Sequence, residues 1–200
     1  MPPALSREEF DAIEFDAAAS GDHESAARRM NRLAWAGTET ETMPRSEAFL
    51  RAGEQWLLAD DPAAAATGFR LALADGGPVF VDPRVPLARA LFLLDQPAEA
   101  QALLDQLKAE GRRDPRACDL VAELLVERSD LTGALDWATA GVELCLQRQS
   151  NGEPGPADRD SSGDEGGAEA ELRLLLSLRY RIRNDLGLPE DSYDELLDEA

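Results

Sequence analysis

The sequence predicts an all-α protein in which short antiparallel helix pairs follow one another along the chain. Alanine is abundant and aromatic residues make up only 6% of the 200 residues, which favours closely packed helices over a sheet sandwich. Helix-start and helix-stop signals recur with short gaps between them. Residues 78–81 are the one candidate strand. Because proline and aspartate flank this segment, we interpret it as a loop between helices.

Acidic caps and prolines mark the predicted helix starts. An Asp or Ser side chain accepts a hydrogen bond from the free N–H groups of a first turn, and proline suits the first helical position. Glycine adopts a left-handed conformation without strain and so marks the predicted ends. The starts are at Asp22, Asp61-Pro62, Pro97, Asp114-Pro115 and Ser129-Asp130, and the ends are at Gly21, Gly37, Gly76 and Gly111.

A pattern of small and aromatic residues begins at Ser46 and recurs roughly 35 and then roughly 34 residues later. Small residues let two paired helices approach closely, and larger side chains fill the space between one pair and the next. Leucine replaces the aromatic residues in the second and third units. The three units contain Phe49, Ala52, Gly53, Trp56, Ala65, Phe69 and Ala72, then Leu87, Ala88, Leu91, Ala100, Leu104 and Leu107, then Val121, Ala122, Leu125, Ala134, Ala138 and Gly141.

A weaker unit with Ala17, Gly21, Ala26 and Met30 precedes these three, at a spacing of roughly 39 residues. The pattern over residues 8–147 resembles the tetratricopeptide repeat (TPR) family. This resemblance implies a right-handed α-α superhelix, a solenoid of three to four helix pairs plus a C-terminal capping helix. An irregular helical bundle is the alternative architecture.

The composition changes after residue 149 and divides the chain into three predicted parts. Residues 6–149 form the helical repeat domain. Residues 150–168 are rich in glycine, proline, serine and acid and have no large aliphatic residue, which predicts a disordered acidic linker. Residues 169–200 predict a capping helix over the apolar end of the array, followed by a short acidic helix. On the capping helix, Arg179, Arg181 and Arg183 are expected to face outward.

The charge balance limits the classes of partner. Forty acidic against twenty basic residues give a net charge of −20, which repels nucleic acid and anionic membrane surfaces. The expected partner is a protein with a basic or amphipathic segment. Arg28, Arg29 and Arg32 form a basic cluster on one helix. We interpret it as a solvated face, because Glu24 is placed to pair with Arg28.

Two further features concern the cellular location of the chain and the type of genome that encodes it. The chain has neither an apolar run long enough to span a membrane nor a secretory signal, so a cytoplasmic location is expected. Lys108 is the single lysine among the twenty basic residues, which is typical of a high-GC bacterial genome.

Catalysis has little support in the sequence. His23 is the single histidine, so no catalytic triad or metal-ligand set can be assembled around histidine. There is no glycine-rich phosphate loop and no Cys or His pair with metal-ligand spacing. Cys118 and Cys145 stand among apolar neighbours and are interpreted as buried thiols. We therefore expect no enzymatic activity, no metal and no cofactor.

The family resemblance also implies a binding surface. Ligand peptides of TPR proteins commonly lie along the concave groove formed by the first helix of each pair. The residues found here do not match the lysine and asparagine that clamp a carboxylate tail, so a co-chaperone role of that kind is disfavoured. An ordinary solvated helix face is the alternative interpretation. Carried over position by position, the groove contains Leu50, Glu54, Leu57, Val85, Arg89, Phe92, Asp119, Glu123 and Val126.

These observations favour an adaptor that binds a peptide or helix of a partner in the concave groove. The alternative is a structural or assembly subunit that acts through homo- or hetero-oligomerisation. An acidic decoy of nucleic acid and an enzyme are weaker alternatives. Trp35 and Trp137 lie on second helices, away from the core positions. Each one either anchors an interface or covers a neighbouring helix.

Overall fold

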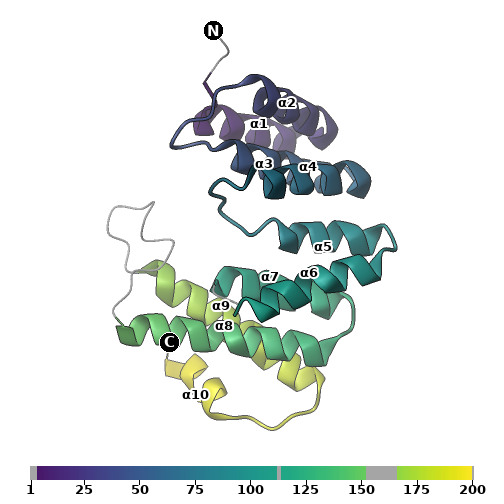
Figure 1. The fold of residues 1–200 in the computed structure, drawn as a ribbon. Coiled ribbons are helices and arrows are strands. Elements are labelled where there is room, and N and C mark those ends of the chain that lie inside the picture. The colour runs from purple at the N-terminus through teal and green to yellow at the C-terminus, as the bar shows by residue number, and fades with distance from the viewer. Residues whose placement is uncertain (1–3, 112–113, 152–165, 200) are drawn as a thin grey trace. The chain divides into compact units, whose positions relative to one another are not determined.

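The computed structural model describes residues 4–111, 114–151 and 166–199, and over these residues the chain is all-α, as predicted (Figure 1). Within them the pairing of β type is limited to two isolated bridges, and residues 78–81 form a loop. The helices are α1 (Arg7–Ser20), α2 (His23–Ala36), α3 (Arg45–Leu58), α4 (Pro62–Asp75), α5 (Arg84–Leu93), α6 (Pro97–Ala109), α7 (Pro115–Glu127), α8 (Leu131–Asn151), α9 (Gly166–Asp185) and α10 (Ser192–Glu199).

The chain forms two compact units, Met1–Gln106 and Leu107–Ala200. The first unit contains α1 to α5 and most of α6, and the second contains the rest of the described helices. Neighbouring helices in the chain pack against each other within each unit, which is a helical repeat arrangement. The predicted linker at 150–168 lies mostly outside the described residues. Its two ends are helical, because α8 continues to Asn151 and α9 begins at Gly166.

The predicted caps start the helices as expected. Asp22, Asp61 and Asp130 each accept a hydrogen bond from the backbone N–H three residues further along the chain, at N···O distances of 3.1, 2.9 and 2.9 Å. Asp114 accepts one from the N–H of Arg116 at 3.2 Å. Each bond satisfies a donor that the first helical turn leaves without a partner.

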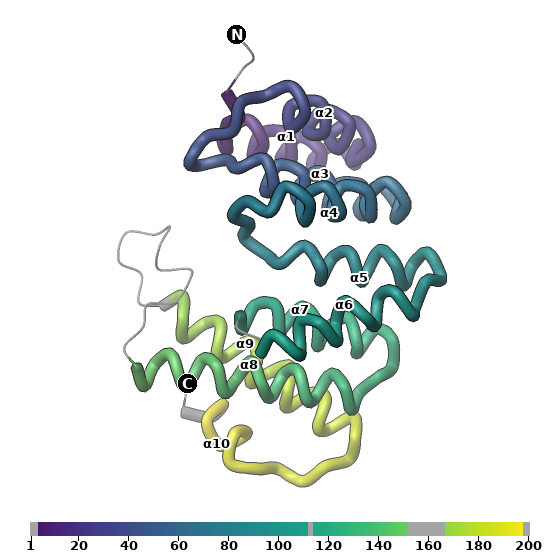
Figure 2. The backbone as a smooth tube through the Cα atoms, in the orientation of Figure 1, coloured from purple at the N-terminus to yellow at the C-terminus, as the bar shows by residue number. Residues whose placement is uncertain are grey.

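The chain reverses direction after α1, α3, α5, α7 and α9 (Figure 2), and a left-handed residue stands at each of these five turns. In the last four of these turns, the residue after the left-handed one donates its backbone N–H to the carbonyl oxygen five residues before it. The N···O distances are 2.9, 2.9, 2.9 and 3.0 Å. This is the hydrogen bond that ends a helix in a Schellman motif. The left-handed residues are Gly21 (φ 76°), Asp60 (φ 59°), Asp95 (φ 57°), Ser129 (φ 62°) and Gly187 (φ 67°).

The spacing of these turns confirms the predicted register and extends it. The first four are 39, 35 and 34 residues apart, as the repeat pattern requires. The fifth, at Gly187, joins α9 to α10. The predicted capping helix and short acidic helix therefore share the left-handed turn of the earlier pairs, which is followed here by a longer link to Ser192. We call α1, α3, α5, α7 and α9 the first helices, and their successors the second helices.

Two glycines bring α3 and α4 into close contact. A Cβ atom added to Gly68 would lie 3.1 Å from the Cα atom of Gly53. A Cβ atom added to Gly53 would lie 2.5 Å from the Cε1 atom of Phe69, whose side chain is fully buried. Both glycines are therefore required for the backbones to approach at this point, because the core has no room for a methyl group.

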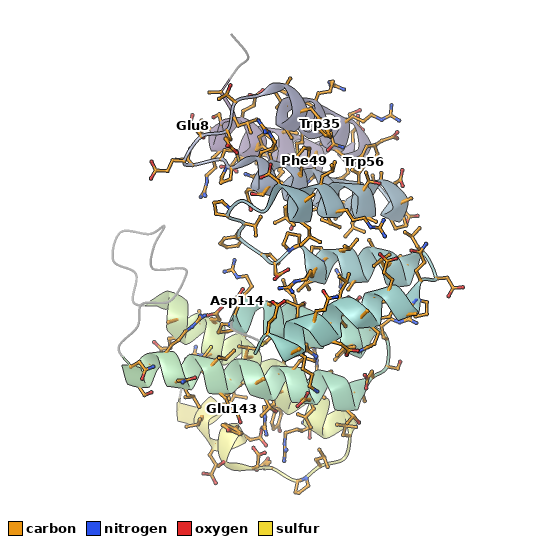
Figure 3. All side chains as sticks on the ribbon, viewed as in Figure 1. Glu8, Trp35, Phe49, Trp56, Asp114 and Glu143 are labelled. Atoms are coloured by element: carbon orange, nitrogen blue, oxygen red, sulfur yellow. The ribbon has the colours of Figure 1, made fainter. Side chains whose placement is uncertain are left out.

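Aromatic side chains fill the space between α2 and α3. Trp56 is buried beneath the guanidinium of Arg28. Phe49 meets the Trp35 ring edge-on, with ring centroids 5.2 Å apart (Figure 3). Trp35 nevertheless stays 65% exposed, whereas Trp137 is buried in the second unit. Trp137 therefore fits the interpretation of a side chain that covers neighbouring helices. Trp35 lies at the surface.

One hydrophobic cluster of the second unit lies between α8 and α9. It is formed by the buried side chains of Val142, Cys145, Leu172, Leu175 and Leu176. Both cysteines are reduced and buried, as predicted. Burial raises the pKa of the Cys145 thiol to about 12, with the nearby Glu171 carboxylate adding to the shift. This thiol therefore stays protonated and behaves as an apolar core atom.

One prediction for α9 is wrong, because Arg179 does not face outward. Its side chain is only 3% exposed and binds the carboxylates of Asp191 and Asp194, with N···O distances of 2.5 and 3.2 Å. Arg183 is also largely buried and bonds the same two carboxylates, while Arg181 is exposed as expected. The acids at the start of α10 supply the charge that allows burial of the guanidinium.

The close contact between α3 and α4 gives a test of the repeat model. We expect Gly53→Ala to lower the free energy of unfolding by about 1–3 kcal/mol, because the added methyl group overlaps the buried Phe69 ring. This loss outweighs the roughly 1 kcal/mol that alanine gains over glycine in a helix. Urea unfolding followed by circular dichroism measures the change. The double variant Gly53→Ala/Phe69→Leu should lose less than the sum of the single variants, whereas strict additivity would contradict the contact.

Candidate functional site

The nine predicted groove residues all lie on first helices, but they differ in exposure. Leu50 and Val85 are only 1% and 4% exposed, so their side chains belong to the core and do not line a surface. Glu123 is exposed. Residues on α3 and α5 belong to the first unit, and those on α7 belong to the second. The half-buried members of the set are Glu54, Leu57, Arg89, Phe92, Asp119 and Val126.

The left-handed turns assign equivalent positions on every first helix. Glu54, Arg89 and Glu123 each stand six residues before a left-handed residue. By the same count the equivalent residues are Phe15 on α1 and Arg181 on α9, which the sequence analysis did not include. Both are exposed, Phe15 by 76%. The glycine that ends each of these two helices is the signal that locates them.

A surface pocket of about 210 Å³ opens between α7 and α9 in the second unit. Asp119, one of the predicted groove residues, contributes to its lining. Leu174 forms part of the wall and is 63% exposed. We call this the α7–α9 pocket. Its lining residues are Arg116, Asp119, Gly167, Ala170, Glu171 and Leu174.

Asp119 carries the first of the two carboxylates in the α7–α9 pocket. Burial raises the pKa of Asp119, and the negative charge of Glu123 raises this pKa further. The guanidinium groups of Arg116 and Arg181 act in the opposite direction without cancelling the shift. The ionised form of Asp119 is therefore less well stabilised than the same group in water.

The second carboxylate of the pocket, Glu171, is in a similar situation. Burial raises its pKa, and the charges of Asp114 and Asp119 add to the shift. Arg148 and Arg116 oppose it. The Arg148 Nη1 atom lies 4.0 Å from the Glu171 Oε2 atom, which is at the outer limit of an ion pair. The pocket therefore contains two carboxylates whose negative charge is incompletely compensated.

In the first unit, an ion-pair network joins α1 to α3. The guanidinium of Arg51 bonds both carboxylate oxygens of Glu14, at N···O distances of 2.8 and 2.6 Å. It also bonds an oxygen of Asp11 at 2.6 Å and lies over the Phe10 ring at 5.6 Å. Because its side chain is only 13% exposed, Arg51 positions α1 against α3 and is not available to a partner.

Glu54 stands one turn further along α3 and has no such partner. Within the described residues, its carboxylate makes no hydrogen bond and no ion pair. Burial raises its pKa to about 7, and the charges of Glu47 and Glu14 contribute to the shift, which Arg51 only partly opposes. Glu54 is therefore partly protonated at neutral pH, and its burial disfavours the charged form.

No family model, no curated protein and no solved structure matches this chain. Within the described residues, no helix is long and apolar enough to cross a membrane.

The raised pKa of Glu54 predicts how stability depends on pH. A carboxyl group with a pKa of about 7 in the folded state and an ordinary value of 4.5 when unfolded binds more protons when folded. The free energy of unfolding should therefore fall as the pH rises from about 4.5 to about 7. Glu54→Gln removes this dependence, so the variant should gain stability over the wild type as the pH rises.

Urea unfolding of the wild type and the Glu54→Gln variant at pH 5 and pH 8 measures this difference. Glu39→Gln, at an exposed loop position, is the matched control and should leave the pH dependence unchanged. A Glu54→Gln variant whose stability relative to the wild type is the same at both pH values would show that Glu54 is not perturbed.

Proposed function

We propose that this protein is a TPR-type adaptor that binds a peptide or helix of another protein on the first helices of its pairs, and that it is not an enzyme. The family assignment is supported by turn spacings of 39, 35 and 34 residues. It is also supported by the small and aromatic residues that pack α3 against α4 and α2. The high-GC signature favours a bacterial source, and the cytoplasm is the proposed location.

The α7–α9 pocket is the observation on which the proposal rests. It lies between two successive first helices, where the family resemblance predicts that ligands bind, and it includes the predicted residue Asp119. Exposed apolar side chains stand among charged ones on two first helices, Leu174 on α9 and Phe15 on α1. A surface of this composition suits an amphipathic segment of a partner protein.

The charge of the chain supports the chemistry of the partner. With a net charge of −20, long-range attraction favours basic proteins and disfavours nucleic acid and anionic membranes. The half-buried Glu54 and the pocket carboxylates place unneutralised acid on first helices in both units. A basic segment bound there relieves the cost of their burial.

A structural or assembly subunit is the second candidate function, and Trp35 is the observation that favours it. A tryptophan that is 65% exposed on a second helix lies outside the predicted groove, and such residues commonly anchor permanent interfaces. Sedimentation equilibrium at low and moderate salt separates the two candidates. A monomer of 21.7 kDa at both salt concentrations supports the adaptor, whereas a stable dimer supports the subunit.

Panning a peptide-display library against the purified chain tests the adaptor proposal. The selected peptides should bind the Leu174→Ser variant about tenfold more weakly than the wild type, equal to about 1.4 kcal/mol, because the exposed apolar contact of the groove is lost. Leu73→Ser, at a partly exposed leucine of the second helix α4, is the matched control. Equal affinity for both variants, or a library that yields no binder, would contradict the proposal.

A further inference from the structure

The α7–α9 pocket has the size of a single side chain. Its volume of about 210 Å³ is below the range of roughly 300–1,000 Å³ that is typical of sites for small molecules and cofactors. It opens at the surface between two helices, so a side chain projecting from a bound peptide can enter it. The size of the pocket therefore favours one anchoring residue of a partner segment over a whole small-molecule ligand.

One wall of the pocket is apolar, and this property is particular to the last pair. Leu174 stands thirteen residues before the left-handed Gly187. The equivalent position is charged in every earlier pair, where it is occupied by Glu8, Glu47, Asp82 and Arg116. Together with Ala170 and Gly167, Leu174 offers a surface that suits the methylene stem of a long side chain.

Another part of the lining carries negative charge. Within the described residues, neither Asp119 nor Glu171 accepts a side-chain hydrogen bond, and the one ion pair of Glu171 is the 4.0 Å contact with Arg148. Arg116 is the cation of the lining. It lowers the pKa of both carboxylates, yet the net shift of each is upward. Burial is the largest cause of both shifts, so the charged forms of these carboxylates are partly desolvated, and a cation bound beside them would stabilise those forms.

Two amino acids, arginine and lysine, have a side chain with an apolar stem that ends in a cation. We propose that the α7–α9 pocket receives an arginine or lysine side chain from the partner segment, with the stem against Leu174 and the charged head group between Asp119 and Glu171. This inference rests on the proposed adaptor function and names the partner residue that the groove selects. Charge-assisted hydrogen bonds to two partly desolvated carboxylates supply both affinity and specificity.

A set of short peptides that differ at one residue tests this proposal. The probes are acetylated and amidated pentapeptides of alanine with arginine, lysine, citrulline or norleucine at the centre. Citrulline has the shape of arginine without its charge, and norleucine has the stem of lysine without its ammonium group. Binding to the full-length chain labelled with ¹⁵N is followed by amide chemical shifts. We expect saturable shifts at Asp119, Ala170, Glu171 and Leu174 with the arginine and lysine peptides.

The citrulline and norleucine peptides should bind about tenfold more weakly or not at all, because the charge-assisted bonds are lost. Glu171→Gln and Asp119→Asn should each weaken the arginine peptide by a similar factor. Both variants should fold, because burial already favours the neutral form at these positions. Glu169→Gln, an exposed carboxylate on the same helix, is the matched control and should leave the affinity of the arginine peptide unchanged.

Equal binding of arginine and citrulline peptides, or shifts confined to other parts of the chain, would overturn the proposal. The outcome is separable from that of the adaptor proposal. If peptides from the display library bind in a Leu174-dependent way but are insensitive to Glu171→Gln, the adaptor function stands and the basic anchor is wrong. If neither the library nor the arginine peptide yields binding, both proposals fail together.

Discussion

The left-handed residue after each first helix is the constraint on which the rest of this structure depends. It reverses the chain within a few residues, so that the second helix starts beside the end of the first. Three of the five residues in this conformation are not glycine: Asp60, Asp95 and Ser129. A left-handed conformation costs such residues free energy. It is therefore maintained by the hydrogen bonds and helix packing around the turn and not by local preference.

Because the turn fixes where each first helix ends, it also fixes which side chains face inward. Residues eight positions before the turn are apolar and buried in the first four pairs, and Arg179 takes this place in the last. Residues six positions before the turn, such as Phe15, Glu123 and Arg181, are exposed, and substitution there costs little stability. The α7–α9 pocket shows how the surface can vary on such a framework. A leucine stands there at a position that is charged in the earlier pairs, next to two half-buried carboxylates, and the same left-handed turn still follows.

Much of this architecture could be predicted from the sequence, because its determinants are local. Aspartate and proline caps mark helix starts, and the small residues at Ala52 and Gly53 mark where helices touch. The remainder depended on contacts distant in sequence. The burial of Leu50, which removes it from the groove, follows from packing against other helices. A break at Gly187 before a short last helix was predicted, but its likeness to the earlier turns was not, because the segment after α8 interrupts the repeat spacing. The pocket required α7 and α9 to be placed side by side.

The last pair differs from the others in a way that bears on how such a chain can grow by gene duplication. Where Gly53, Ala88 and Ala122 let a second helix approach closely, α1 has Glu14 and α9 has the bulky Tyr180. Its neighbour Arg179 depends on the acids of α10, a helix of only eight residues. The modules are thus not interchangeable, because the guanidinium of Arg179 is buried together with the acids that begin α10. A duplication that copied α9 without α10 would leave an unpaired charge in a core.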